Sequence, residues 1–169
     1  GCKRVEAVAT SAVRGATNGA VFLRRIREQT GLRVRVLDGE EEARLAFRSA
    51  LAHFDLGRGR AIVMDIGGGS LEFALAAEGI VERYVSLPFG AVRLTEEFLR
   101  DRPPAKGVKK LRKAVREELR QAIPVRDWRG AEVIGSGGTF TNLAGMFLSR
   151  QGLQVAHSVH GTRMPWHEI

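Results

Sequence analysis

A run of three glycines between two acidic residues most constrains this chain, because a backbone without side chains between charged groups favours a tight, polar turn. The run lies in Asp65–Glu72, with the sequence Asp-Ile-Gly-Gly-Gly-Ser-Leu-Glu. Residues 61–64 before it are apolar and predict a buried strand. Residues 71–76 alternate between large apolar and other side chains, and predict a second strand with Ser70 and Glu72 on the opposite face. The segment is therefore expected to form strand, turn and strand.

The turn offers groups that suit a phosphate and a hard metal ion. Its glycines let the backbone adopt positive φ angles and let its amides approach an anion closely; they are Gly67, Gly68 and Gly69. The carboxylates of Asp65 and Glu72 are ligands that Mg²⁺ prefers, and Ser70 adds a hydroxyl. A glycine-rich hairpin with incidental acids has the same sequence, so both interpretations stay open. A Walker-type loop does not fit, because it ends in Gly-Lys-Ser/Thr, and a dinucleotide-binding fingerprint leads into a helix.

A second glycine segment occurs at 135–139, between an apolar run at 131–134 and a helical pattern at 141–148. The order of strand, glycine loop and helix places free backbone amides at a helix N-terminus, where they can bind an anion. The candidate phosphate-binding residues are Gly137, Gly138 and Thr139. A tight turn that serves packing alone has the same appearance, and the two interpretations have equal weight.

The first part of the chain has the pattern of a βαβα unit. The pattern predicts a strand at 4–9, a loop at 10–14, a helix from Asn18 to Gly31, a strand at 32–37 and a helix over 40–54. The buried side of the last helix is expected to comprise Ala43, Phe47, Ala50, Leu51 and Phe54. Further along, Glu78-Gly79 is placed as the turn of a β-hairpin.

Two charged residues in this first part are candidates for catalysis. Glu40, Glu41 and Glu42 lie in the first helical turn, where capping explains the first two. Glu42 lies nearest the apolar stripe, and a carboxylate partly withdrawn from water there is a candidate general base. Arg14, just beyond the first strand, is either a surface arginine or a phosphate clamp if the strand end opens on a cleft. Position alone decides neither case.

Charge and composition set broader limits on function. The net charge of +8, from 27 basic and 19 acidic residues, favours polyanionic partners such as polyphosphate, phosphorylated nucleotides or nucleic acid. No segment has the roughly 18 apolar residues of a membrane span, and no signal peptide is recognised, so a cytoplasmic protein without a membrane partner is expected. Cys2 is the sole cysteine, and the four histidines lack zinc-ligand spacing. Any metal should therefore be bound by oxygen.

Basic residues concentrate between Arg100 and Arg120 around apolar residues at helical spacing. The pattern predicts an amphipathic helix over 106–122. A solvated face on a core-packed helix explains it better than nucleic-acid binding, since no aromatic residues are interleaved for base stacking.

Five segments together resemble the exopolyphosphatase/guanosine pentaphosphate phosphohydrolase (Ppx/GppA) family of the actin-like ATPase superfamily. The segments are 9–14, 39–45, 65–72, 87–96 and 135–139. Their order and spacing agree with the family over about the whole chain. The resemblance implies an α/β, two-lobed actin-like ATPase (ribonuclease H-like) fold with a cleft. Residues 1–58 would form part of the first lobe and residues 59–169 the second lobe.

The resemblance also implies roles for the candidate residues. Glu42 would be the general base, Arg14 would hold phosphate, and Asp65 with Glu72 would position Mg²⁺ or another divalent cation. The glycine loop and Ser70 would bind phosphate oxygens. The reaction would be hydrolysis of the terminal phosphoanhydride of polyphosphate, of guanosine pentaphosphate, or of both.

Two departures from the family lead us to expect an internal fragment. The chain opens at Gly1 without the glycine/serine loop with which family members begin, and it stops at Ile169 before further expected elements. A non-catalytic fragment that binds polyphosphate or nucleotide, or serves a regulatory role, is therefore the alternative. Dimers are common in the family, but the sequence does not decide whether this chain forms a homodimer.

Overall fold

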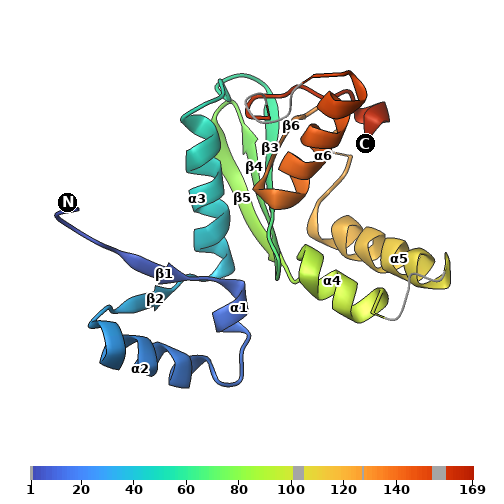
Figure 1. Ribbon diagram of the computed structural model, residues 1–169. Helices are drawn as coiled ribbons and strands as arrows, with labels where there is room; N and C mark the ends of the chain where they lie inside the picture. Colours follow the sequence, from blue (N-terminus) through green and yellow to red (C-terminus); the bar gives the residue numbers. More distant parts are fainter. Residues whose placement is uncertain (1, 101–104, 127, 154–158) are drawn as a thin grey trace.

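A computed structural model of the chain describes residues 2–100, 105–126, 128–153 and 159–169, which form a mixture of helices and strands (Figure 1). The first elements are β1 (Ala7–Ala9), α1 (Ser11–Arg14), α2 (Gly19–Thr30), β2 (Val34–Val36) and α3 (Gly39–Leu51). They are followed by β3 (Arg60–Ile66), β4 (Leu71–Ala77), β5 (Ile80–Leu87), α4 (Ala91–Phe98), α5 (Ala105–Ala122), β6 (Glu132–Ser136), α6 (Gly137–Arg150) and the 3-10 helix η2 (Trp166–Glu168).

A four-stranded sheet forms the centre of the molecule, with the strand order β5-β4-β3-β6. β3, β4 and β5 are antiparallel neighbours, whereas β6 lies parallel to β3. The turn between β4 and β5 is Glu78-Gly79, with φ angles of 50° and 75°. Two consecutive positive φ values are typical of a type I′ hairpin turn, so this sequence prediction is confirmed.

The core occupies both faces of this sheet. On one face, Phe47 and Ala50 of α3 pack against Val63, Ala74 and neighbouring residues. On the other face, a second cluster joins the sheet to Trp128 and to the end of α5. β4 is therefore buried on both sides, and even Glu72 is only 4% exposed. The apolar residues of β4 were expected on one face alone, but alanines extend the buried surface to the other.

The helix α3 lies along the sheet as its periodicity predicts, but it ends at Leu51 (Figure 1). Phe54 therefore lies beyond the helix and is half-buried against the same core. Ala43, Phe47 and Ala50 are buried, while Leu51 is 46% exposed. Leu51 lies about 100° further round the helix than Ala50, which turns it away from the sheet. Its predicted burial is wrong for this reason.

The short strands β1 and β2 form a separate parallel pair near α1 and α2. The expected order of strand, helix, strand and helix is confirmed, although both strands are shorter than predicted. Gly31 ends α2 with a φ of 73°, as a C-terminal glycine should. Residues 11–14, predicted as a loop, instead form α1, in which the Thr10 carbonyl accepts hydrogen bonds from two amides.

The predicted amphipathic helix is present as α5, with its basic side chains exposed and its apolar stripe half-buried. Across the described ranges, no helix combines the length and apolar character needed to cross a membrane.

Candidate functional site

A row of polar residues crosses the sheet near its edge. The paired positions in the row are Ser86 on β5, Glu72 on β4, Asp65 on β3 and Ser136 on β6. Directly paired residues of adjacent strands have side chains on the same face. The next row on this face is Tyr84, Ala74, Val63 and Ile134, which is mostly apolar and belongs to the core under α3. Along each strand, the polar site therefore lies two residues away from the hydrophobic core on the same face of the sheet.

Glu72 is the most buried carboxylate of this row. The hydroxyl of Ser86 donates a hydrogen bond to Glu72 Oε1 at 2.9 Å. Burial raises the pKa of Glu72; the hydroxyls of Ser70 and Ser86 oppose the rise, and the nearby carboxylates of Glu42 and Asp65 add to it. Three carboxylates from α3, β3 and β4 thus lie within electrostatic reach of one another.

The three glutamates in the first turn of α3 make different contacts. The Asp38 side chain accepts a hydrogen bond from the Glu41 amide at 2.8 Å, and Glu41 returns the contact in a capping box. Glu40 pairs with Arg44 one turn later. Both residues have the local roles that capping and surface pairing explain. Glu42 takes part in neither.

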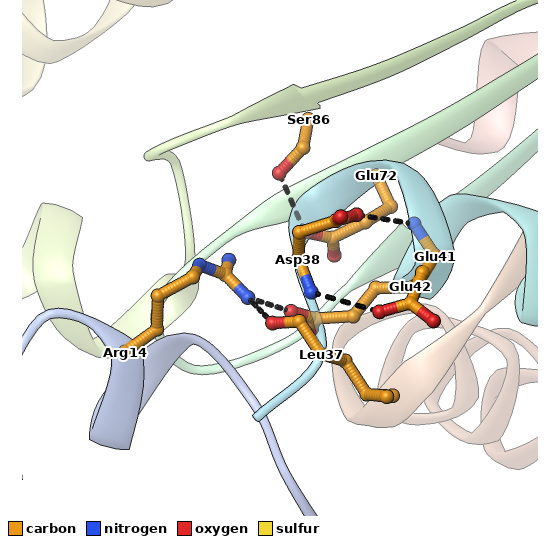
Figure 2. Close-up of polar contacts among 7 residues, drawn as sticks. All are labelled: Arg14, Leu37, Asp38, Glu41, Glu42, Glu72 and Ser86. Carbon is orange, nitrogen blue, oxygen red and sulfur yellow. Dashed lines mark hydrogen bonds and ion pairs between the residues drawn. The ribbon is translucent and has the colours of Figure 1, made fainter. Parts of the chain in front are cut away.

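Glu42 instead forms an ion pair with Arg14, as Figure 2 shows. Nη1 of Arg14 also donates a hydrogen bond to the Leu37 carbonyl at 2.5 Å. The two charged side chains are 31% and 14% exposed, so the pair is largely shielded. Arg14 reaches this position because it is the last residue of α1, the helix that replaced the predicted loop. The structure therefore brings the predicted base and the predicted phosphate clamp into direct contact.

The glycine loop packs closely against its neighbours. The Gly67 amide donates to the Ser70 carbonyl at 3.1 Å, which closes the turn. A Cβ on Gly69 would lie 2.6 Å from Ser11 Oγ. None of the three loop glycines has a positive φ, so the loop does not use this conformational freedom of glycine. At Gly69 glycine is required for close approach, because a side chain there would collide with Ser11 of α1.

The carbonyl groups and the amide groups of the glycine loop differ in their hydrogen bonds. The Gly67 carbonyl accepts a hydrogen bond from the Ala91 amide at 2.9 Å, and the Gly68 carbonyl accepts from Val92 and Arg93 at 2.9 and 3.1 Å. The loop thus satisfies the free amides at the start of α4. In the described part of the chain, no hydrogen bond engages the amides of Gly68, Gly69 and Ser70.

Gly90 allows this arrangement and was given no role by the sequence analysis. A Cβ on Gly90 would collide with the peptide between Gly68 and Gly69. The segment 87–96 carried the family resemblance, but only the fold shows that its helix start rests on the glycine loop. The available signal was a glycine immediately before a helical pattern, which is common in turns.

These elements enclose a cavity of about 790 Å³. Its walls include Glu42, Asp65, Glu72 and the loop from Gly67 to Ser70. Residues Thr10, Ser11 and Ala12 line it from the α1 side, and Val92, Arg93, Glu96 and Glu97 line it from α4. Arg14 does not line the cavity, but it forms an ion pair with Glu42, which does.

The second glycine segment lies at the same sheet edge but outside the cavity lining. Gly137 has a φ of 85°, and a Cβ there would lie 2.5 Å from Asp65 Oδ1. α6 begins at Gly137, so Gly137, Gly138 and Thr139 form the first turn of a helix and not a preceding loop. Their role in binding phosphate stays a prediction, whereas the packing of Gly137 on β3 is direct.

The carboxylates of Asp65 and Glu72 fit a hard divalent cation whose remaining ligands are water or substrate phosphates. Among the described residues, no group of three or more His, Cys, Asp or Glu side chains is arranged to hold a metal ion. Asp65 and Glu72 are, however, direct cross-strand partners, and the nearby negative charge that raises the pKa of Glu72 is the kind that a cation would relieve. Mg²⁺ is commonly held by one or two carboxylates together with water and substrate phosphates.

The elements and this cavity define an α/β protein with the fold of solved Ppx/GppA structures, and the α/β class agrees with the expectation from the sequence. Residues 1–154 match the model of the Ppx/GppA phosphatase family, and the chain belongs to that family.

Related proteins of the family cover most of this chain. Exopolyphosphatase 1 of Mycobacterium leprae (strain TN) is 41% identical over 133 residues, which cover 79% of this chain and 35% of that protein. Exopolyphosphatase 2 of Mycobacterium tuberculosis (strain ATCC 25618 / H37Rv) is 35% identical over 175 residues, covering 96% of this chain and 53% of that protein. The chain thus spans between about a third and about half of these relatives.

Solved structures agree with this assignment. The crystal structure of an exopolyphosphatase from Cytophaga hutchinsonii superimposes with a TM-score of 0.79 at 31% identity, covering 90% of this chain and 50% of that one. A Ppx/GppA family member from Aquifex aeolicus gives a TM-score of 0.74 at 32% identity, with 98% of this chain and 53% of that chain covered.

Proposed function

We propose that this chain carries the catalytic cleft of a phosphoanhydride hydrolase that releases the terminal phosphate of polyphosphate, of guanosine pentaphosphate, or of both. The observation that carries the proposal is the meeting of Glu42, Asp65 and Glu72 with the glycine loop in one cavity. The exopolyphosphatase names of the relatives support the polyphosphate substrate.

Glu42 is the general base in this proposal. It lies on the cavity wall, and its ion pair with Arg14 fixes the carboxylate near the cleft. It would accept a proton from a water molecule as the water oxygen attacks the terminal phosphorus. The bond from that phosphorus to the bridging oxygen breaks, which yields orthophosphate and a phosphate chain shorter by one unit.

Backbone and side-chain donors would hold the phosphate groups. The unengaged amides of Gly68, Gly69 and Ser70 border the cavity together with the Ser70 side chain. Arg14 does not line the cavity, so a phosphate that it holds would have to lie beside Glu42. One Arg14 nitrogen binds Leu37 and Glu42, and N–H donors remain on the others. Gly137, Gly138 and Thr139 at the start of α6 are a secondary candidate for the same purpose.

Asp65 and Glu72 would hold Mg²⁺ or another divalent cation. When bound, such an ion neutralises charge on the phosphate oxygens and on the leaving group. The same two carboxylates, without a cation, would repel an anionic substrate from the cleft.

The division into lobes at residues 1–58 and 59–169 belongs to the proposal as well. It is supported by the cavity, which has Thr10 to Ala12 on one wall and the glycine loop on the other. α3 precedes the boundary in sequence and packs on the four-stranded sheet that follows it. The expected cytoplasmic location and homodimer also remain proposals.

Phosphate release from tripolyphosphate and from guanosine pentaphosphate, measured with Mg²⁺ for Glu42→Gln, tests the function. We expect a loss of about 10²- to 10⁴-fold in kcat, the usual contribution of a general base. Glu40→Gln is the matched control, because Glu40 lies in the same helical turn and, among the described residues, pairs with Arg44 alone. Unchanged turnover in Glu42→Gln would contradict the assignment. Tight binding without phosphate release by the unsubstituted protein would support the non-catalytic alternative.

A further inference from the structure

Arg93 differs in the sign of its charge from the other charged residues described in the cavity lining. It is the only basic residue among the described residues that line the cavity, whereas five carboxylates do so. These acids are Glu42, Asp65, Glu72, Glu96 and Glu97. A phosphate entering this cavity therefore meets an excess of negative charge and a single guanidinium.

The backbone of Arg93 is fixed relative to the glycine loop. Its amide donates a hydrogen bond to the Gly68 carbonyl at 3.1 Å, within the first turn of α4. Val92 beside it lies against the same loop, with Cγ2 at 3.4 Å from the position that a Cβ on Gly68 would take. The side chain of Arg93 thus starts from a defined point beside the amides proposed to hold phosphate.

The Arg93 side chain is exposed, and its guanidinium lies near the turn after α1. Glu96 and Glu97 follow at helical spacings of three and four, at which ion pairs commonly form. Within the described part of the chain, however, no ion pair or hydrogen bond engages the Arg93 side chain. Its Nη2 atom lies instead 3.5 Å from the position that a Cβ on Gly15 would take, directly after α1. No described residue occupies any of its five guanidinium donors, which leaves them for a ligand.

Arg14 differs from Arg93 in this respect. Its guanidinium is already bound to Glu42 and to the Leu37 carbonyl (Figure 2), and the residue lies behind the cavity wall. One arginine is therefore engaged in holding the candidate base, and the other is unengaged at the wall of the cleft.

We propose that Arg93 is a substrate-binding residue that clamps a phosphate group between α4 and the turn at Gly15. The assignment rests on the proposed function for the class of ligand, a phosphoanhydride. The planar guanidinium can bind two phosphate oxygens at once and adds the positive charge that the carboxylate-rich wall lacks. Because the clamp acts on binding and makes no contact with the attacking water, its loss should raise KM more than it lowers kcat.

Binding of tripolyphosphate in the presence of Mg²⁺, measured by calorimetry and separately from phosphate release, tests the clamp. We expect affinity to fall about 10- to 100-fold in Arg93→Gln, the range for one charge-assisted contact. Arg93→Lys should recover part of this loss, since lysine keeps the charge without the bidentate geometry. The matched control is Arg116→Gln, which removes an exposed arginine from the neighbouring helix α5 outside the cavity.

The outcomes separate this inference from the proposed function. Equal affinity of Arg93→Gln and the unsubstituted protein would overturn the clamp, as would an equal loss in Arg116→Gln. A selective loss of binding in Arg93→Gln supports it even if no phosphate is released, a result that would contradict only the hydrolase assignment. Absence of tripolyphosphate binding by the unsubstituted protein would overturn the clamp. A purely structural role predicts a lower Tm with unchanged affinity, and that result would also overturn it.

Discussion

The two glycine segments follow neighbouring parallel strands and emerge at the same edge of the sheet, yet the fold uses them differently. After β3, the Gly67–Ser70 loop lines the cavity and leaves amides unengaged. After β6, Gly137 adopts a φ of 85° and packs against Asp65 outside the cavity lining. Similar sequences thus provide a candidate ligand site in one case and a packing contact in the other. The difference lies in which atoms surround each glycine.

The largest expected effect concerns stability at the second segment. Gly137→Ala should lower the free energy of unfolding by about 2 kcal/mol or more, because alanine is strained at this positive φ and its Cβ would meet Asp65 Oδ1 and the Ile66 carbonyl. Urea unfolding followed by circular dichroism measures the change. Stability equal to that of the unsubstituted protein would contradict the packing role of Gly137.

An intermediate effect is expected on binding at the first segment. In Gly69→Ala the new Cβ would meet Ser11, which should push α1 away from the loop and weaken tripolyphosphate binding about tenfold, or about 1.4 kcal/mol. Calorimetric titration with Mg²⁺ present measures the affinity. The double variant Gly69→Ala with Ser11→Gly should recover binding, because the second change removes the colliding side chain. Failure of this recovery would indicate that Gly69 acts in another way.

A smaller effect concerns the pH dependence of stability that Glu72, next to the first glycine loop, introduces. Since burial raises the pKa of Glu72, the folded protein keeps a proton that the unfolded chain has already lost. This contribution to stability is fully present below the ordinary glutamate pKa and is lost as the pH rises through the raised pKa. The stability of Glu72→Gln relative to the unsubstituted protein should therefore increase as the pH rises above the ordinary glutamate pKa of about 4. Urea unfolding in chelator-treated buffer would detect this; a constant difference above that pH would contradict the shift.

The smallest expected effect is at Gly138, where a Cβ would meet no atom within 4 Å. Gly138→Ala should raise stability by about 0.4 to 1 kcal/mol, because alanine reduces the freedom of the unfolded chain. Thermal unfolding measures this change, and the same variant is the neighbouring control for Gly137→Ala. A loss of phosphate binding in Gly138→Ala would make the second segment a ligand site too and would end the contrast with the first.

Local patterns predicted much of the fold. Alternating polarity and the Glu78-Gly79 pair identified the hairpin, and helical periodicity identified α3 and α5, because these features depend on neighbours close in sequence. Two local predictions were wrong. Leu51 was expected to be buried, but it is turned away from the sheet. Residues 11–14 were expected to form a loop, but hydrogen bonds to the Thr10 carbonyl make them the helix α1.

For the candidate site, the sequence identified Glu42, Asp65, Glu72 and the glycine loop, all of which line the cavity. It did not identify the contact of Arg14 with Glu42, the role of Gly90, or the position of Arg93. Each of these depends on segments that are distant in sequence: α1 with α3, the start of α4 with the loop, and α4 with Gly15.

The sequence by itself determined which residue types were available: carboxylates at a strand end, a backbone free of Cβ atoms, and an acidic first turn of a helix. Tertiary structure alone decided which glycines line the cavity and which pack outside it, and which arginine forms an ion pair with Glu42. The physical reason is that propensity and periodicity act over a few residues. Close approach, burial of Glu72 and the pairing of charges arise only when distant segments meet across the sheet edge.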